Sequence, residues 1–375
     1  DVDILAISRS PKKVMDHFVD FEDVKEVVSK GKTKSTVRLR TGLQVDLRVV
    51  PKKSYGAALF YFTGSKTHSI ALRNAAKRKN LKVNEYGVFK GKRRLAGKTE
   101  EDVYEALGLP WIAPELRENR GEVDAARKDE LPDLIELDDI RGDLQSHTTV
   151  SDGHDTLENM ARAAKDRGYD YLAVTDHTTG LPMTQGLDPE KLPGQIEEIE
   201  KLNKKLKGFR ILKSVEVEIR KDGSLDWDNE LLEQLDLVVG SVHSHFNLSA
   251  EEQTKRVLRA MENPHFHILG HPTGRILGKR PPMEIDLEKV MEAALEHGCF
   301  LELNAQPDRL DLDDRYCKMA KDMGLKLAIS TDAHRVAELD FMRFGIGQAR
   351  RGWLEADDVI NTRKWKDLKK LLKRQ

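Results

Sequence analysis

The sequence predicts an α/β chain in which a parallel, barrel-like domain follows a smaller α+β region. From Ile140 onward, short apolar runs alternate with helical stretches, the order expected of parallel strands joined by crossover helices. His and carboxylate residues follow these runs, and ten of the 12 His lie between Asp143 and His334. In parallel barrels the reactive groups lie at the carboxyl ends of the strands, which is where these residues fall.

Length, cysteine content and charge narrow the possible classes of protein. The 375 residues suffice for two or three domains. Two Cys, Cys299 and Cys317, neither in a C-x-x-C pair, exclude a disulfide framework and predict a reduced, cytoplasmic compartment. We expect neither a membrane span nor a signal peptide, because no apolar run is long enough.

The net charge of −1 hides an asymmetry. Residues 1–120 carry 25 Lys/Arg against 15 Asp/Glu, a net of +10, and residues 121–375 carry 38 against 49, a net of −11. The basic part predicts a polyanionic partner, and the acidic part is compatible with holding cations. Ordinary solvated charge is the alternative for the basic part.

Three carboxylates lie on the first predicted strands. Asp1 and Asp3 share one face of the strand D-V-D-I-L-A-I-S, and Asp46 lies in an alternating strand predicted over Thr36–Val50. If the two strands are neighbours, the three carboxylates meet and can hold Mg²⁺ or Mn²⁺ ions for nucleotidyl transfer. A solvated strand face would give the same pattern.

A Y-F-T-G-S turn over 61–65 precedes a basic amphipathic helix predicted over Lys66–Lys79. L-K-V-N-E-Y-G over 81–87 then predicts a strand and a turn. Together these stretches resemble the palm and thumb of the family X DNA polymerases. The resemblance implies metal binding by the three carboxylates named above, nucleotide contacts at Tyr61, Phe62 and Gly64, and a template contact at Arg73. Without it, Tyr61 and Phe62 are most simply core aromatics.

The chain departs from the family pattern in two ways. Ser69 stands where the family often has Asn. The lyase and fingers regions, and the G-S-x-x-R turn before Asp1, are absent. We therefore expect part of a longer polymerase, with an unpaired edge at its first strand. Gap-filling polymerase activity is accordingly expected of the full-length protein and not of this part.

A charge-dense, Pro-containing stretch over Ala113–Asp139 reads as an interdomain linker, with a short helix near Glu115–Lys128. The predicted domains are therefore 1–112 and 140–375. Five helices are expected in the second domain, at Thr156–Arg167, Pro189–Lys205, Ala250–Glu262, Leu287–His297 and Asp313–Met323.

Six motifs follow the strands of this second domain. They are D-L-Q-S-H-T-T-V-S-D-G (143–153), T-D-H (175–177), V-E-V-E (215–218), S-V-H-S-H (241–245), G-H-P-T (270–273) and S-T-D-A-H (330–334). In this order they resemble the polymerase-and-histidinol-phosphatase (PHP) domain, whose fold is a distorted (β/α)₇ barrel with up to three metals. A PHP domain behind a family X core resembles the bacterial and archaeal family X polymerases with 3′–5′ exonuclease activity, and this resemblance covers essentially the whole chain.

The resemblance implies nine metal-ligand positions, at Gln145, His147, Asp152, His177, Glu216, His243, His271, Asp332 and His334. Gln145 stands where the general pattern has a His. An amide oxygen is a poorer, neutral ligand, so the first metal subsite is expected to be weaker or completed by water.

The family scheme groups these ligands into three subsites: His147, Glu216 and Asp332; Glu216 as a bridge to His243 and His271; and Asp152, His177 and His334. All ligands offer N or O atoms, which suits Mn²⁺, Zn²⁺ or Fe²⁺. The expected catalytic residues are His147, Glu216, His243, Asp332 and His334.

Several neighbouring residues have alternative interpretations. Asp176 either orients His177 or caps a helix. Glu218 and His245 each lie two residues from an assigned ligand and could take its place. Arg275, after H-P-T-G, either binds phosphate or pairs with a carboxylate. Four further His are expected to be structural or exposed: His154, His265, His267 and His297.

The expected function is metal-dependent hydrolysis at DNA 3′ ends, as an exonuclease, a 3′-phosphatase or an abasic-site endonuclease. Metal-activated water attacks phosphorus, and no Ser or Cys nucleophile is needed. The expected partners are gapped or 3′-ended DNA and, for the full-length protein, deoxynucleotides. The protein is expected to be a monomer. The alternatives are a small-molecule phosphatase of the histidinol-phosphatase type and a non-catalytic DNA-binding module.

Overall fold

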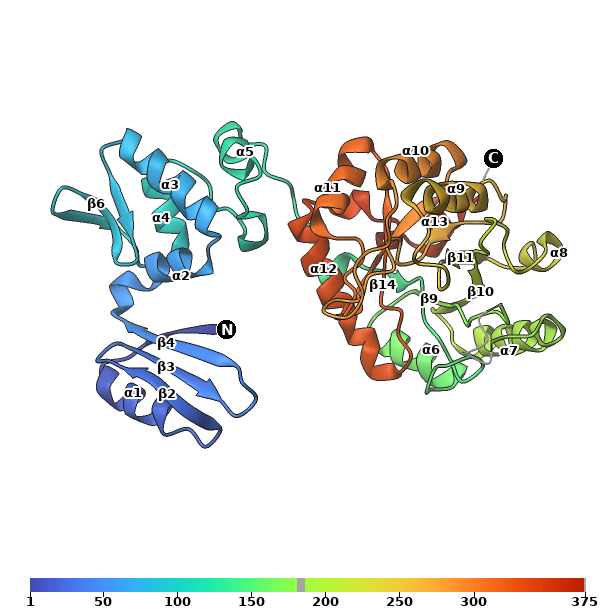
Figure 1. Cartoon of the computed structure of the whole chain (residues 1–375), viewed down its shortest axis with the longest axis horizontal. Coiled ribbons are helices and arrows are strands. Elements are labelled where there is room, and N and C mark those ends of the chain that lie inside the picture. The colour runs from blue at the N-terminus through green and yellow to red at the C-terminus, as the bar shows by residue number, and fades with distance from the viewer. Residues whose placement is uncertain (181–185, 374–375) are drawn as a thin grey trace. The chain divides into compact units, whose positions relative to one another are not determined.

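The computed structural model describes residues 1–180 and 186–373 and divides into two compact units (Figure 1). The first unit is Asp1–Leu131 and the second is Pro132–Gln375. The boundary between them lies inside the stretch 113–139 that the sequence analysis assigns to a linker. Residues 113–131 of that stretch belong to the first unit, so much of the stretch is folded.

The first unit begins with a four-stranded sheet. Its strands are β1 (Val2–Ile7), β2 (Val24–Lys30), β3 (Lys34–Leu39) and β4 (Gln44–Val50), in the order β1-β4-β3-β2. Helix α1 (Pro11–Val19) packs Met15 against Leu47 and Val49 of β4. β1 runs parallel to β4 and lies at the edge of the sheet.

The single strand predicted over Thr36–Val50 is wrong, because β3 and β4 form a hairpin instead. The chain turns at Gly42, whose φ of +87° suits a residue without a Cβ. The hydrophobic alternation continues through the turn because both strands bury the same face. Val37 of β3 pairs with Val45 of β4, and both belong to one apolar cluster.

Helices and a small second sheet complete the first unit. The elements are η1 (Lys52–Ser54), α2 (Tyr55–Thr63), α3 (Lys66–Arg78), β5 (Lys82–Asn84), β6 (Gly87–Lys90), β7 (Arg93–Ala96), α4 (Glu100–Ala106), η2 (Pro114–Leu116) and α5 (Glu122–Lys128). The basic helix predicted over 66–79 and the strand and turn predicted over 81–87 are confirmed. Ser65 caps α3, since its hydroxyl accepts from the His68 N–H.

The second unit is built on seven parallel strands that follow one another in sequence order. They are β8 (Gly142–Asp143), β9 (Tyr171–Val174), β10 (Arg210–Glu218), β11 (Leu237–Ser241), β12 (Ile268–Leu269), β13 (Phe300–Asn304) and β14 (Leu327–Ser330). Beyond the two outer strands, Ser146 bridges Ala333 in parallel, and the His147 N–H donates to the Ala333 carbonyl at 2.8 Å. The sheet therefore nearly closes on itself, which confirms the predicted seven-stranded barrel.

Helices surround these strands in Figure 1. They are α6 (Leu157–Asp166), α7 (Leu192–Lys205), α8 (Asn229–Leu232), α9 (Ala250–Met261), α10 (Leu287–His297), α11 (Asp314–Met323), α12 (Met342–Arg351) and α13 (Trp365–Leu371). Short 3₁₀ turns are η3 (Leu137–Asp139), η4 (Pro189–Lys191), η5 (Val336–Phe341), η6 (Ala356–Asp358) and η7 (Ile360–Thr362). All five predicted helices are present. Within the described residues, no helix combines the length and apolar character needed to cross a bilayer.

The barrel interior changes from apolar to polar along the strands. Leu212 of β10 packs with Val239 of β11, Ala328 of β14 and Leu368 of α13 in an inner cluster. The side chains of a strand alternate between its two faces, so Glu216, four residues after Leu212, points into the same interior nearer the carboxyl end. The strand ends are thus the polar end of the barrel.

Candidate metal centre

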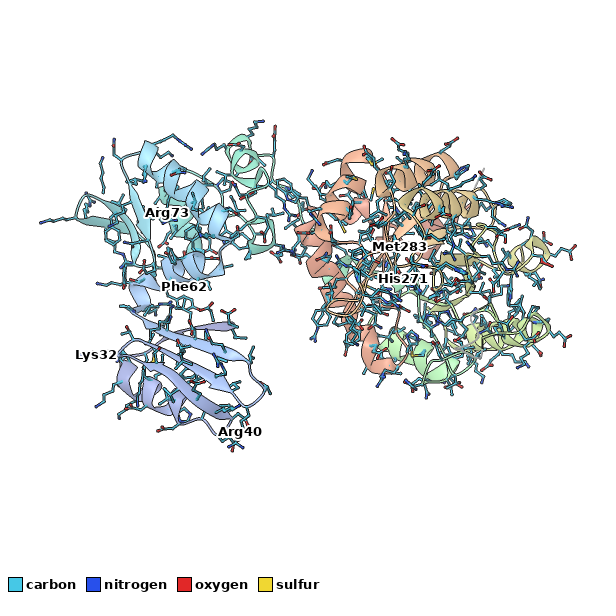
Figure 2. The ribbon with its side chains drawn as sticks, in the orientation of Figure 1. Lys32, Arg40, Phe62, Arg73, His271 and Met283 are labelled. Carbon is cyan, nitrogen blue, oxygen red and sulfur yellow. The ribbon has the colours of Figure 1, made fainter. Side chains whose placement is uncertain are left out.

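The predicted ligands come together at the carboxyl ends of the barrel strands. Their positions are as follows: His147 and Asp152 follow β8, His177 follows β9, Glu216 lies in β10, His243 follows β11, His271 follows β12, and Asp332 and His334 follow β14. Figure 2 shows His271 in the interior of the second unit, where it is buried. Residues up to 187 positions apart in the sequence, from His147 to His334, therefore reach one site.

Glu216 lies at the middle of the group. Its Oε2 is 3.4 Å from His147 Nε2 and 3.3 Å from His177 Nδ1. Its Oε1 is 3.5 Å from His243 Nε2 and 3.3 Å from His271 Nε2. The side chain is 1% exposed. One buried carboxylate with two imidazoles on each oxygen is the arrangement that a bridge between two metals requires.

Two further carboxylates complete the site. Asp152 Oδ2 lies 3.6 Å from His177 Nε2 and 3.5 Å from His334 Nε2. Asp332 Oδ1 lies 3.0 Å from His147 Nε2. Three overlapping groups have all their ligand atoms within 4.8 Å of one another: His147, Asp152, His177 and His334; His177, Glu216 and His243; and His147, Glu216 and Asp332.

Unsatisfied buried atoms test whether these residues suit a metal. Atoms without a hydrogen-bond partner in the protein include both oxygens of Glu216, both ring nitrogens of His147, Nδ1 of His271 and both polar side-chain atoms of Gln145. Buried polar groups are normally paired, because leaving one unpaired costs free energy. Nitrogen and oxygen atoms of this kind are the donors that first-row divalent metals accept, so the residues fit such ions.

The protonation states of Asp152, Asp332 and His177 suit metal binding, whereas that of His334 opposes it. Burial opposes ionisation of Asp152, yet His334 and its neighbouring imidazoles lower the pKa of this carboxyl to about 2. The pKa of Asp332 is likewise held well below its usual value, mainly by His147. Burial lowers the pKa of His177 to about 4 and keeps it neutral, whereas Asp152 and Asp332 raise the pKa of His334 to about 10. His334 must therefore release a proton before it can bind a metal.

Glu218 orients a predicted ligand in this structure. Its Oε2 lies 2.8 Å from His243 Nδ1, and its Oε1 accepts from the Ser244 hydroxyl at 2.8 Å. The guanidinium of Arg256 lies 3.5 Å from the same carboxylate. A carboxylate on one ring nitrogen fixes the orientation of an imidazole whose other nitrogen faces the metal. His243 Nε2 is the nitrogen that faces Glu216.

Asp176 has a similar supporting position. Its oxygens accept from the Thr148 N–H at 2.7 Å, the Thr148 hydroxyl and the Ser151 hydroxyl at 2.8 Å, and Gln195 Nε2 at 2.8 Å. These contacts hold the loop that runs from His147 to Asp152. The hydrogen bonds that Asp176 accepts therefore come from that loop and from Gln195.

Gln145 is buried beside the assigned ligands. Its backbone carbonyl accepts from the Asp332 N–H at 3.0 Å, which ties Gln145 to the loop after β14. A Cβ at Gly270 would lie 3.5 Å from Gln145 Oε1, so the amide also approaches the residue before His271. The backbone of Gln145 is thus tied to the loop of Asp332, and its side chain lies near the residue that precedes His271.

Two of the predicted ligands have unusual backbone conformations. His271 and Asp332 have φ of +27° and +52°, a region that non-glycine residues rarely adopt. Such conformations persist where the surroundings over-determine them, and they cluster at functional sites. His245 also has a positive φ, but it is exposed and belongs to none of the three groups.

Three residues near Asp332 were not predicted from the sequence to lie at this site. Asn304 Nδ2 donates to Asp332 Oδ2 at 3.0 Å and to Glu302 Oε2 at 3.1 Å. Burial and the nearby Asp332 raise the pKa of Glu302 well above its usual value. Arg309 Nε lies 3.8 Å from Asp332 Oδ2. The available signal was the polar run E-L-N-A-Q-P-D-R after an apolar strand, which contains no His.

The palm carboxylates are only partly brought together. Asp3 pairs with Asp46 in the β1–β4 register, as neighbouring strands require. Lys34 Nζ lies 3.1 Å from Asp46 Oδ2. Among the described residues, Asp1, Asp3 and Asp46 do not form a group of converging ligand atoms like those of the second unit. A metal site there stays a prediction.

The predicted nucleotide contacts lie around the end of α2. Tyr61 and Phe62 are half-buried, and their rings form an edge-to-face pair with centroids 5.1 Å apart. The Arg48 guanidinium lies 4.2 Å from the centre of the Phe62 ring. Gly64 ends α2 with φ of +77°. On α3, Arg73 is half-buried, and its Nε donates to the Ser69 carbonyl at 3.3 Å.

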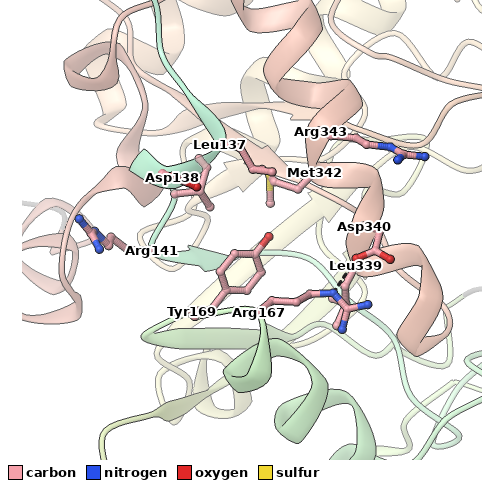
Figure 3. A pocket seen from close by; sticks show the side chains of 11 residues that line it. Leu137, Asp138, Arg141, Arg167, Tyr169, Leu339, Asp340, Met342 and Arg343 are labelled. Atoms are coloured by element: carbon pink, nitrogen blue, oxygen red, sulfur yellow. Dashed lines mark hydrogen bonds and ion pairs between the residues drawn. The ribbon is translucent and has the colours of Figure 1, made fainter.

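A pocket of about 520 Å³ lies at the opposite end of the barrel strands (Figure 3). Arg141 directly precedes β8 and Tyr169 lies two residues before β9, so this pocket is at the amino ends of the strands. Arg167 on its wall is paired with Asp340 at 2.8 Å. No His lines it, and it is therefore separate from the candidate metal centre.

Comparison with known proteins gives matches in both units. Residues 58–118 match the DNA polymerase beta thumb family, and residues 143–306 match the PHP domain family. The chain is 40% identical over 378 residues to the DNA polymerase/3′-5′ exonuclease PolX of Bacillus subtilis (strain 168). That alignment covers 100% of this chain and 66% of the relative, so the chain spans about two thirds of its length.

Other relatives match one part of the chain. A probable phosphatase of Thermoanaerobacter sp. (strain X514) is 33% identical over 232 residues, which are 58% of this chain and 90% of the relative. A crystal structure of Leishmania infantum polymerase beta, a ternary P/T complex, is 25% identical over 31% of this chain and 60% of that one, with a TM-score of 0.27.

Proposed function

The chain belongs to the family X DNA polymerases that carry a PHP domain, and on this basis we propose that its second unit hydrolyses phosphate esters at DNA 3′ ends. The observation that carries the proposal is the set of four imidazoles around Glu216, whose two buried oxygens make no hydrogen bond within the protein. The main activity is a 3′–5′ exonuclease, and 3′-phosphatase or abasic-site endonuclease activity would use the same chemistry.

Up to three divalent ions, Mn²⁺, Zn²⁺ or Fe²⁺, would be held by the nine positions expected from the sequence, with Gln145 as the weakest ligand. Bound divalent metals supply a water molecule activated at neutral pH and neutralise charge on the phosphate.

The chain's own residues prepare this site. The low pKa of Asp152 and the burial that keeps His177 neutral leave both side chains in the form that binds metal. Glu218 holds His243 in one orientation. His147, Glu216, His243, Asp332 and His334 are the proposed catalytic set, and each belongs to at least one of the three groups of converging ligand atoms.

The first unit is proposed to bind DNA. Its net charge of +10 over residues 1–120 suits phosphate contacts, which makes binding weaken as salt rises. Tyr61, Phe62 and Gly64 would contact a nucleotide and Arg73 the template, with Mg²⁺ or Mn²⁺ at Asp1, Asp3 and Asp46. We assign polymerase activity with deoxynucleotides to the full-length protein, and propose domains at 1–112 and 140–375 joined by 113–139.

A small-molecule phosphatase is the second candidate, because a probable phosphatase is 33% identical over 58% of the chain. The basic first unit favours DNA instead. We further propose that the protein acts as a monomer in the cytoplasm, a reducing compartment that suits two buried cysteines outside any disulfide.

The test compares two substrates with the full chain in Mn²⁺. We expect release of label from 3′-labelled DNA and little phosphate from histidinol phosphate, with the DNA activity lost in His334→Ala. His154→Ala is the matched control, since its side chain lies outside the three groups. DNA degradation that survives His334→Ala would refute the metal mechanism, and preference for histidinol phosphate would favour the second candidate.

A further inference from the structure

A cationic side chain beside the candidate metal centre has a donor without a partner. Arg309 lies in the loop after β13, with its Nε 3.8 Å from Asp332 Oδ2. Its Nη1 is buried and makes no hydrogen bond within the protein. An unpaired buried donor is costly, so this position favours a ligand that brings acceptor oxygens.

The loop that carries Arg309 is fixed to the metal centre by its backbone. Gln306 donates from Nε2 to the Asp332 carbonyl at 2.8 Å. From the other side, Arg275 donates to the carbonyls of Arg309, at 2.9 Å, and of Leu310. The two donors of Arg275 that point to this loop are therefore occupied, which favours a supporting role for Arg275 over phosphate binding.

Positive charge accumulates on this side of the site. Arg280 lies on the neighbouring loop, with its guanidinium 3.9 Å from the centre of the Phe246 ring. Burial, and then the charge of Arg309, lower the pKa of Arg280. The charges of Arg280 and Arg309 act on one another, which suits an anion that neutralises them.

We propose that Arg309 binds the phosphate of the substrate, donating its guanidinium hydrogens to the non-bridging oxygens of the group that the metal centre holds. A guanidinium presents a planar fork of donors that matches phosphate oxygens, and it stays charged at all working pH values. This assignment rests on the proposed function, because it takes a phosphate ester as the ligand. It makes Arg309 a substrate-binding residue.

The test separates phosphate binding from metal binding. Inorganic phosphate is titrated calorimetrically into the Mn²⁺-loaded full chain, and bound metal is measured for each variant. Arg309→Met should weaken phosphate binding about 10- to 100-fold with unchanged metal content. Arg309→Lys should weaken phosphate binding about 2- to 5-fold, because the charge remains but the planar fork of donors is lost. Arg162→Met, an exposed Arg on α6 paired with Glu158, is the matched control.

Two results would overturn the assignment. One is an unchanged phosphate affinity in Arg309→Met. The other is loss of metal from both Arg309 variants, which would mean that Arg309 acts through Asp332. With 3′-labelled DNA, kcat/KM should fall in parallel with phosphate affinity. Wild-type protein that binds phosphate through Arg309 but leaves DNA intact would contradict the proposed function alone.

Discussion

Two buried clusters of His and Glu in this chain differ in whether their polar atoms have partners. In the first unit, His68 Nδ1 lies 2.5 Å from Glu122 Oε1, and His68 Nε2 lies 2.9 Å from the Tyr104 hydroxyl. Glu122 also accepts from the backbone N–H groups of Asn119 and Arg120, at 3.0 and 2.7 Å. Each side chain of the pair is fully buried, and the hydrogen bonds form a closed network.

In the second unit, Glu216 is equally buried and has four imidazoles around it, but its oxygens make no hydrogen bond. Proximity of His and carboxylate side chains therefore does not by itself identify a metal site. A cluster whose atoms satisfy one another stabilises the fold. A buried cluster with unsatisfied atoms costs stability until a ligand arrives, which is why we assign metals to Glu216 and none to Glu122.

The largest expected effect is that of the substitution Glu216→Gln on the rate of hydrolysis. Two of the three ligand groups share Glu216, so its loss should remove metal and lower kcat/KM on 3′-labelled DNA by about 10³-fold or more. Bound metal and initial rates are the measurements. Glu122→Gln is the matched control and should leave both unchanged. A Glu216→Gln protein that retains metal and activity would remove the distinction between the two clusters.

Next in size is the effect of Glu122→Leu on stability. It leaves His68 and two backbone N–H groups without their partner, which should cost the first unit about 3–5 kcal/mol of unfolding free energy. Hydrogen exchange of peptides from α3 in a urea series measures this unit within the full chain. Added Mn²⁺ should not restore the loss. Rescue by metal would show that this cluster also binds one.

Metal addition should stabilise the second unit more than the first, because the described residues with converging ligand atoms lie in the second unit. At a free Mn²⁺ concentration of 100 times Kd, binding to the native state adds about 2.7 kcal/mol. Scanning calorimetry should show the transition of the second unit moving upward with metal further than the transition of the first unit. In Glu216→Gln the first of these shifts should shrink or disappear, while an equal upward shift of both transitions would contradict the assignment.

A smaller effect is expected from Glu218→Gln. The amide is a weaker acceptor for His243 Nδ1, so metal affinity should fall about 10- to 100-fold, measured by competition with a chelator. Glu230→Gln, on exposed α8, serves as the control. Complete loss of metal would instead indicate that Glu218 is itself a ligand.

The smallest effect is the pH dependence of the His68–Glu122 pair. Burial would raise the pKa of Glu122, but His68 and the backbone N–H groups lower it below its usual 4.5. A carboxyl with a lowered folded-state pKa contributes stability that is present above the unfolded-state value and is lost as pH falls through the folded-state value. The stability difference between wild type and Glu122→Leu, followed by α3 hydrogen exchange, should therefore hold at pH 6 and shrink below pH 4.5. A difference that grows on acidification would contradict this sign.

The sequence was sufficient for the barrel because its signals are local. Each strand of the second unit is a short apolar run, and the ligands follow immediately, so their convergence required only the rule for parallel strands. Helix α10 (Leu287–His297) was predicted with its observed bounds because Asp286 caps its start and Gly298 ends it.

What the sequence did not reveal depends on contacts between distant residues. The hairpin at Gly42 was not predicted because the hydrophobic alternation continues unchanged through a turn between two strands that bury the same face. The role of Glu218 depends on His243, 25 residues later, and that of Arg309 on Asp332. Spacing places Glu218 on the same face as Glu216 but cannot tell which of them has an imidazole as its partner.

The alternation along β10 constrains how this protein can diverge. Leu212 and Glu216 occupy one face of a single strand, so a one-residue insertion between them would turn Glu216 toward the helices and bring a valine to the centre. A two-residue insertion would keep the face but displace the carboxylate by about 6.6 Å. Neither change can be repaired by one substitution. Length variation among descendants of this gene should therefore accumulate in the loops, while the five residues from Leu212 to Glu216 keep their spacing.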